Sequence, residues 1–206
     1  MLEREYRELS FVTRWSLLRR IRNQSIAEHS YYVALYSLQI AKLVKWPDAF
    51  PGTAGGLGDL LQAALYHDLG EVVSGDPPGP VHRRAILNAD HWHKEIALGV
   101  KRRFGEGVTE EWRAANNPQS NIGLEIKSIV KVADSLDALF YLLTEQQMGN
   151  GTVRGVVAQE RRRLFKAIDT MGKVLRLDIN ELVTSMSEVI HDHENESSLI
   201  PDEDGL

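Results

Sequence analysis

The chain has 206 residues, of which 43% are hydrophobic, and a formal net charge of -5. This length suits one large domain, and the acidic balance argues against a partner that is a nucleic acid polymer. Because there is no Cys, disulfides and thiolate metal sites are excluded, and any metal must be held by His, Asp, Glu and water. No apolar run approaches a membrane span and the charged start has no signal core, so we expect a soluble, cytoplasmic protein without membrane partners.

Apolar residues recur at helical spacing along most of the chain, and strand patterns are scarce. Stretches rich in Gly, Pro or Asn separate the periodic segments and are typical of loops. The pattern therefore predicts an all-α helical bundle that forms a single domain over residues 1–195, followed by a frayed acidic tail at 196–206. Helices are expected at about residues 27–46, 59–71, 89–104, 124–148, 156–175 and 179–190.

The helix predicted at 59–71 ends in a group of residues that can carry chemistry. On an α-helix, Glu71 lies on the same face as His67 and Asp68. One imidazole and two carboxylates in a small volume suit a divalent metal with a water molecule beside it. For this stretch alone, a surface His-Asp pair at a helix end is the plainer interpretation.

Two further candidates for metal ligands lie elsewhere in the chain. His29 is early in the first long helix, and Asp134 lies inside the apolar helix at 124–148. Two His and two Asp fit Mn, Fe, Co, Ni or Zn and leave coordination positions for water and substrate. Taken singly, His29 could be a surface residue and Asp134 could pair with Lys131. A second acid, Asp137, shares the Asp134 face, and two acids on so apolar a helix must face water or meet a cation.

Other His residues are weaker candidates. The pair at His191 and Asp192, with His193 beside it, belongs to the acidic end of the chain and follows no apolar helix. His91 and His93 are two residues apart, so they point to different sides of a helix. Neither group is expected to bind metal. The Gly-rich stretch at 55–58 has no preceding strand and no following Lys-Ser/Thr, which argues against a phosphate-binding loop.

The dipeptide Arg14-Trp15 precedes the first long helix. An exposed Trp beside an Arg could stack on a base and pair with a phosphate. The alternative is a Trp that seals the core, with the Arg at its rim.

Taken in order, these motifs resemble the HD-domain metal-dependent phosphohydrolases. They are most similar to the bacterial 5'-deoxynucleotidase branch, to which phage dATP triphosphohydrolases are related. The resemblance runs from about residue 8 to about residue 145, and more loosely to about 195. The matching stretches are Arg14-Trp15 and residues 25–30, 66–72, 75–81 and 130–138.

The resemblance implies a role for each matching residue. A divalent transition metal (Mn, Co, Zn, Ni or Fe) would be held by His29, His67, Asp68 and Asp134. Glu71 would orient or activate the attacking water, and Asp76 would assist as an acid/base group or a contact to a second metal. Substrate would be bound by Arg14, Trp15, Pro78, His82 and Arg83. Gly79 and His82 stand where the family has a small hydroxyl residue and a Lys, which leaves the phosphate-end contacts open.

The implied function is a metal-dependent 5'-deoxynucleotidase that converts a deoxynucleoside monophosphate to deoxynucleoside and phosphate, as a dimer or larger homo-oligomer. The close alternative is a triphosphohydrolase that converts dATP to deoxyadenosine and triphosphate. An alternative of another class is a non-catalytic HD module that binds a nucleotide. A cyclic-nucleotide phosphodiesterase is disfavoured by Arg14-Trp15 and by the match at residues 75–77.

Overall fold

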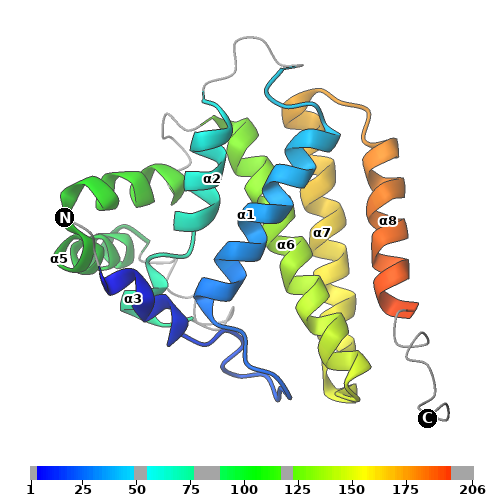
Figure 1. Cartoon of the computed structure of the whole chain (residues 1–206), viewed down its shortest axis with the longest axis horizontal. Coiled ribbons are helices and arrows are strands. Elements are labelled where there is room, and N and C mark those ends of the chain that lie inside the picture. Colours follow the sequence, from blue (N-terminus) through cyan, green and yellow to red (C-terminus); the bar gives the residue numbers. More distant parts are fainter. Residues whose placement is uncertain (1–3, 49–54, 77–88, 117–122, 196–206) are drawn as a thin grey trace, which may run out of the picture.

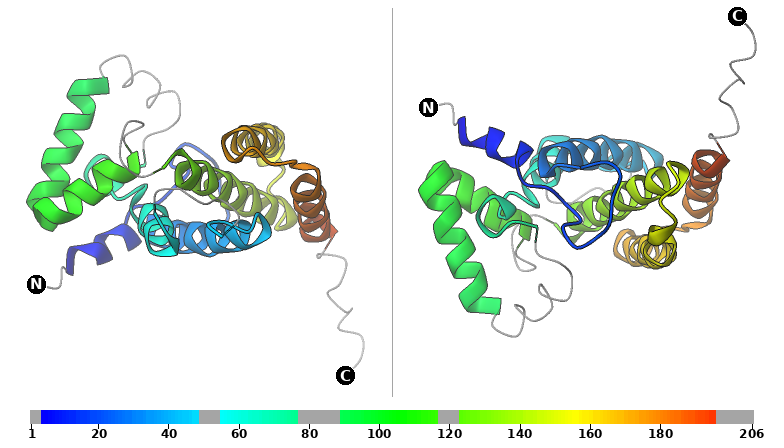
Figure 2. Two further views of the ribbon diagram at one scale, coloured as in Figure 1. Left: turned by 90° about the horizontal axis from the view of Figure 1, so that it is seen from above. Right: turned by 90° about the horizontal axis from the view of Figure 1, so that it is seen from below.

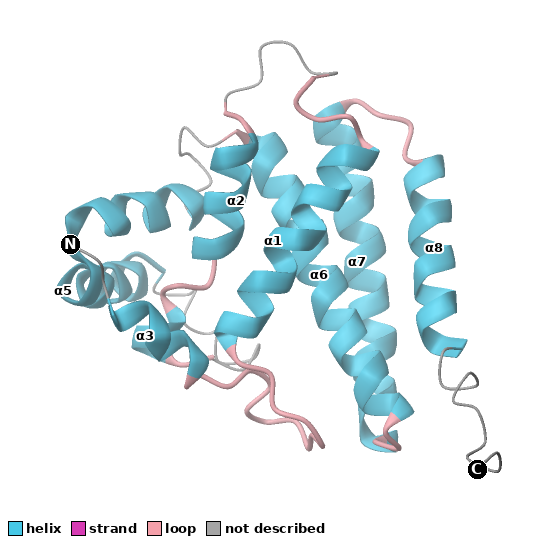
Figure 3. Ribbon diagram, in the orientation of Figure 1, coloured by secondary structure: helices cyan, strands magenta, loops and turns pink. Residues whose placement is uncertain are grey.

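The computed structural model describes residues 4–48, 55–76, 89–116 and 123–195, and within these ranges the regular structure is helical (Figures 1 and 3). The all-α prediction is confirmed, and the one β-bridge described, between Thr13 and Ser25, is isolated. None of the described helices is long and apolar enough to cross a membrane. The elements are η1 (Arg4–Ser10), α1 (Ile26–Leu43), α2 (Leu57–Tyr66), α3 (Glu71–Ser74), α5 (Ala89–Asn116), α6 (Leu124–Gln147), η3 (Gly151–Val153), α7 (Arg154–Leu175) and α8 (Asn180–Asn195).

Helix α6 is the centre of a first hydrophobic core. It packs between α1 and α7, and α8 lies on the outer side of α6 and α7 (Figures 1 and 2). Leu, Ile and Val side chains cover α6 on several faces, which is why it can be buried along most of its length. Its fully buried residues include Ile126, Ile129, Leu139 and Leu142.

A second core joins η1, α5 and the turn after α2. Leu9, Leu69, Phe104 and Trp112 are among its buried residues. Helix α5 was predicted to end at Phe104, but the chain bends at Gly105 (φ 82°, ψ 175°) and resumes as helix to Asn116 (Figure 2). A residue with this positive φ is most readily a Gly, and the bend folds the two halves of α5 around the second core.

The predicted helix at 59–71 was wrong at its carboxyl end. Helix α2 ends at Tyr66, and the amides of Leu69 and Glu71 bond to carbonyls three residues earlier. Packing explains the change, because Leu69 is fully buried in the second core. At Gly70, a Cβ atom would lie 2.8 Å from both Ile96 and Trp112, so only Gly allows this close contact.

The ends of helices α1 and α8 also differ from the predicted ones. Helix α1 begins at Ile26, because the Ser25 Oγ accepts the Glu28 N–H (3.1 Å), and it ends at Leu43, three residues before Trp46. Helix α8 runs to Asn195, five residues beyond its expected end at about residue 190. His193 is anchored there against α6, with its ring 4.9 Å from that of Phe140.

Candidate metal centre

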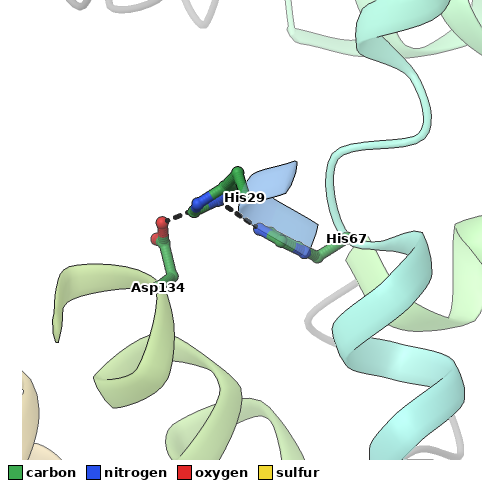
Figure 4. A group of neighbouring side chains, drawn as sticks. All are labelled: His29, His67 and Asp134. Carbon is green, nitrogen blue, oxygen red and sulfur yellow. Dashed lines mark hydrogen bonds and ion pairs between the residues drawn. The ribbon is translucent and has the colours of Figure 1, made fainter. Parts of the chain in front are cut away.

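The four predicted metal ligands come together where the two cores meet. His29 is fully buried on α1, and its Nε2 lies 3.2 Å from His67 Nε2, 3.4 Å from Asp68 Oδ2 and 3.5 Å from Asp134 Oδ1. His67 Nε2 is 3.3 Å from Asp68 Oδ2. Figure 4 shows His29, His67 and Asp134 converging from α1, from the turn after α2 and from α6.

The separations between these atoms fit one divalent ion. Ligand atoms about 2.1 Å from an ion are about 3.0 Å apart in octahedral and about 3.4 Å apart in tetrahedral geometry. Two imidazole nitrogens with carboxylate oxygens form a donor set that suits a transition metal. The donor atoms of His29, His67 and Asp134 all lie within 4.8 Å of one another. Those of His29, His67 and Asp68 lie within 3.4 Å of one another.

Hydrogen bonds at Nδ1 orient both imidazoles with Nε2 toward the cluster. His67 Nδ1 is 2.7 Å from the Ala64 carbonyl, which only accepts, so Nδ1 donates and Nε2 keeps its lone pair. His29 Nδ1 is 2.5 Å from Asp137 Oδ2, and this carboxylate oxygen accepts the Nδ1 hydrogen as the Ala64 carbonyl does for His67. In the neutral form of each ring, Nε2 therefore presents a lone pair to the cluster.

Asp137 was not predicted as a member of the site. It is buried, and its Oδ2 also accepts a hydrogen bond from Gln24 Nε2 (2.9 Å). The signal available in the sequence was an acid one turn after Asp134 on an apolar helix. An acid in this position is expected to have a hydrogen-bonding or charged partner, but the sequence does not identify that partner as His29 Nδ1.

The site concentrates negative charge. Burial, together with the Asp68 and Asp76 carboxylates, raises the pKa of Glu71 to about 10. Glu71 Oε2 is buried and has no hydrogen-bond partner among the described residues. Burial and Arg14 lower the pKa of His29, but its hydrogen bonds with nearby carboxylates outweigh them and raise it to about 10. A divalent cation would offset this excess of negative charge.

Arg14 lies inside the site rather than at its rim. The Arg14 side chain is 12% exposed, and its Nη2 lies 3.8 Å from Asp134 Oδ1 and its Nη1 3.5 Å from Asp137 Oδ2. Nη1 is also 2.6 Å from His29 Nδ1. Because a guanidinium only donates, it cannot form a hydrogen bond with a Nδ1 that itself donates to Asp137. The hydrogen-bond acceptors for Arg14 are then the carboxylates. Arg14 is therefore a largely buried cation held by acids.

Trp15 is half-buried and held in an unusual backbone conformation, with φ 62°. Its ring stacks on Tyr141, with the centroids 5.9 Å apart and the planes 4° apart. The Trp15 N–H donates to Asp76 Oδ2 (2.7 Å), and burial of Asp76 raises the pKa of its carboxyl despite this bond. Asp76 thus holds the Arg14-Trp15 segment against the cluster.

A cavity of about 400 Å³ opens beside the cluster, between α6 and α7. Arg14, Trp15 and Asp134 line one part of it, and Glu160, Arg163 and Lys166 line the α7 side. The sequence offered no signal for these α7 residues beyond a basic run, which is more often a solvated surface. The predicted substrate contacts Pro78, His82 and Arg83 lie outside the described residues.

Comparisons with known proteins identify the family of this chain. A family model described as 5'-deoxynucleotidase YfbR-like matches residues 4–185. A 5'-deoxynucleotidase of Erwinia tasmaniensis is 32% identical over 151 residues, which cover 69% of this chain and 71% of the relative. A dATP triphosphohydrolase of Salmonella phage PMBT28 is 31% identical over 146 residues, which cover 69% of this chain and 66% of the relative.

Solved structures share the fold. An HD phosphohydrolase of cyanophage S-2L, bound to dA and one catalytic Zn²⁺ ion, matches with a TM-score of 0.63 and 22% identity, covering 93% of this chain and 98% of that one. An HD-domain phosphohydrolase from Listeria innocua matches with a TM-score of 0.62 and 16% identity, covering 95% of each chain.

Proposed function

This chain belongs to the YfbR-like family of 5'-deoxynucleotidases and is an HD-type phosphohydrolase, and from this premise we propose that it hydrolyses deoxynucleoside 5'-monophosphates to deoxynucleoside and phosphate. The observation that carries the proposal is the convergence of two imidazoles and two carboxylates beside Glu71 and Arg14. Such a set can hold a metal, a water molecule and a phosphate together.

The metal ligands in this proposal are His29, His67, Asp68 and Asp134. Their donor set and the excess negative charge around them fit a divalent transition metal. When bound there, the ion would polarise a phosphoryl oxygen and lower the pKa of a bound water.

Glu71 is the proposed acceptor of the water proton. Its Oε2 is buried and free of hydrogen-bond partners within the described ranges, so it can accept one. With its pKa raised, the Glu71 carboxyl is protonated at neutral pH when no cation is bound. A divalent ion beside it would lower that pKa and leave a carboxylate that can take the water proton. Asp76 is placed to assist as a second acid/base group, while it also holds the Trp15 amide.

Arg14 and Trp15 are the proposed substrate contacts. The Arg14 guanidinium would neutralise the phosphate charge, since guanidinium and phosphate pair through parallel hydrogen bonds. The Trp15 ring, braced by Tyr141, would lie against the sugar and leave no room for a 2'-hydroxyl. Together they would favour deoxyribose over ribose.

A turnover panel tests the proposal. Metal is stripped and Mn²⁺, Co²⁺ or Zn²⁺ is added back, dAMP, AMP and dATP are offered, and the released anion is identified. We expect phosphate from dAMP and little from AMP. Equal rates for dAMP and AMP would contradict the role of Trp15, and bound metal without turnover of any nucleotide would favour the non-catalytic module.

Glu71→Gln separates metal binding from turnover. We expect the variant to retain metal in a binding titration and to lose about 10²- to 10⁴-fold in kcat, because the proton acceptor is gone. The control is Glu95→Gln, an exposed Glu on α5, which should keep wild-type kcat. Full activity of Glu71→Gln would remove Glu71 from the mechanism.

A second candidate is a triphosphohydrolase on the same scaffold. Both reactions break the bond between the α-phosphorus and O5', and they differ in the phosphates that the α-phosphorus carries. The basic lining of the α6–α7 cavity is the observation that favours this candidate.

A further inference from the structure

A second cavity lies among α1, α6 and α8 and has a volume of about 440 Å³. Cavities that bind small molecules usually measure about 300–1,000 Å³. Glu28, Tyr32 and Tyr36 line it from one face of α1, since they stand four residues apart. Asp192 and His193 line the α8 side. None of the described residues around this cavity is a proposed metal ligand or substrate contact, so the proposed reaction leaves the cavity unused.

Four aromatic rings form a continuous series along the cavity. The Tyr32 and Tyr36 rings stack with their centroids 6.3 Å apart. The Phe140 ring, on α6, lies at 65° to that of Tyr36, with the centroids 5.7 Å apart, and the His193 ring follows 4.9 Å from Phe140. Because the Tyr36 and Phe140 rings are not parallel, they form a corner in which one group can contact both. The face of an aromatic ring carries partial negative charge and attracts a cation.

The charged groups around the cavity are paired, with one exception. Arg22 forms an ion pair with Glu28. Asp137, which also lines the cavity, has its Oδ2 atom 3.5 Å from Arg14 Nη1. Asp192 is exposed and has no ion-pair partner in the part of the chain that the structure describes. The charge that remains uncompensated in the described lining is therefore negative, which disfavours an anion such as a phosphate and favours a cation.

The Tyr32 and Tyr36 hydroxyls are available to a ligand, because neither has a hydrogen-bond partner among the residues described. Burial and the nearby Asp137 carboxylate raise the pKa of Tyr36 to about 12, so this hydroxyl stays neutral at physiological pH. The Tyr141 hydroxyl is already used, since it donates to the Arg22 carbonyl (2.6 Å). The cavity thus offers ring faces, two neutral hydroxyls and one unpaired carboxylate.

We infer that this cavity binds a small organic cation, with an ammonium group on an aliphatic body. The ammonium group lies in the corner between Tyr36 and Phe140, where the ring faces attract it, and Asp192 supplies the compensating charge from α8. Aromatic side chains recognise alkylated ammonium groups in this way because such cations are held by the rings without strong directional hydrogen bonds. The site is separate from the proposed hydrolysis and does not depend on it.

Choline and its neutral carbon analogue 3,3-dimethylbutan-1-ol test the inference, because they share a shape and differ in charge. Binding of each to the metal-loaded wild type is measured by calorimetric titration. The bound metal prevents the acids of the proposed metal centre from attracting choline. We expect choline to bind at least tenfold more tightly than the alcohol. Equal binding of the two, or no binding of choline, overturns the inference.

Two variants locate the bound choline. Asp192→Asn removes the unpaired charge and Tyr36→Leu removes a ring, so each should weaken choline binding at least fivefold. Tyr36→Phe keeps the ring and should retain the preference for choline over the alcohol. Unchanged choline binding in Asp192→Asn or in Tyr36→Leu overturns the inference, because the cation would then lie elsewhere.

Matched controls make the same changes outside the cavity. Asp178→Asn neutralises an exposed acid before α8, and Tyr31→Leu removes an exposed ring from α1. Both should bind choline as the wild type does. Weakening in Asp178→Asn as large as in Asp192→Asn would show that choline responds to the net charge of the protein, and this result also overturns the inference.

Discussion

At the scale of single residues, Asp137 is the side chain that prepares His29 for its proposed role. Its carboxylate holds His29 Nδ1 from behind and is itself held by Gln24. A ligand imidazole that donates to a carboxylate is fixed in orientation and is a better donor to a metal. The contribution of Asp137 is therefore to metal affinity rather than to substrate binding.

Asp137→Asn should weaken metal binding about 10- to 100-fold, because the amide keeps the shape but loses the charge that supports the His29 ring. A competition titration with a chromophoric chelator measures the change. Asp169→Asn, an exposed acid paired with Lys173 on α7, is the control and should bind metal as the wild type does. Wild-type affinity in Asp137→Asn would mean that the ring is held by packing alone.

The four proposed ligands and Glu71 could be named from the sequence because they stand in motifs whose order and residue types are distinctive, and their roles stay predictions. Asp137 could not be assigned in this way. Helical spacing places it near Asp134, but only the packing of α1 on α6 brings it to His29. The largely buried position of Arg14 depends in the same way on contacts distant in sequence.

At the scale of elements, the segment that carries Arg14 and Trp15 is held in place by α6. Glu145 is fully buried, and its two oxygens accept the N–H groups of Ile21 and Arg22, each at 2.7 Å. Asn150 Nδ2 donates to the same carboxylate (2.7 Å). Burial opposes ionisation, but these hydrogen bonds outweigh it and lower the pKa of Glu145 below its ordinary value.

This shift predicts the pH range in which Glu145 stabilises the fold. A carboxyl with a lowered pKa stabilises the folded chain above the unfolded pKa of about 4.3, and the stabilisation is lost as the pH falls through the folded pKa. Glu145→Gln should thus lower the free energy of unfolding by about 1–3 kcal/mol at pH 7. The difference from wild type should shrink below about pH 4.

Thermal unfolding between pH 3 and pH 7 measures this difference. Glu188→Gln, an exposed Glu on α8, serves as control and should follow the wild type at every pH. A difference between Glu145→Gln and wild type that stayed constant down to pH 3 would contradict the ionised role of Glu145.

The long helices could be predicted from periodicity, and α6 and α7 fall within two residues of the expected ends. The turn at 67–70 could not, because its sequence is compatible with helix. Its conformation is set by Leu69 entering the second core and by the contact of Gly70 with Trp112. A local pattern does not reveal that a second core exists.

At the scale of the whole molecule, the proposed ion would join α1, α6 and the turn after α2. A ligand that binds only the folded state stabilises it by about 2.7 kcal/mol at 100 times its dissociation constant. Added metal should therefore raise the Tm of the metal-free wild type in a concentration-dependent way.

His67→Ala or Asp134→Ala should abolish this rise in Tm together with hydrolysis, because each removes one donor from the cluster. Differential scanning fluorimetry with and without metal measures it. His91→Ala, which changes an exposed His on α5, should respond to metal as the wild type does. A full rise in Tm in His67→Ala would place the ion elsewhere.

The position of the cluster between two separately packed cores has a consequence for cooperativity. Leu69 anchors the ligand-bearing turn in one core, whereas Asp134 belongs to the helix at the centre of the other. If one ion is bound by residues from both cores, unfolding of either core breaks the bonds between that ion and its ligands. The metal-loaded protein should therefore unfold in a single cooperative transition. Chelation removes that coupling, and the ratio of van't Hoff to calorimetric enthalpy should then fall below one as the two cores begin to melt independently.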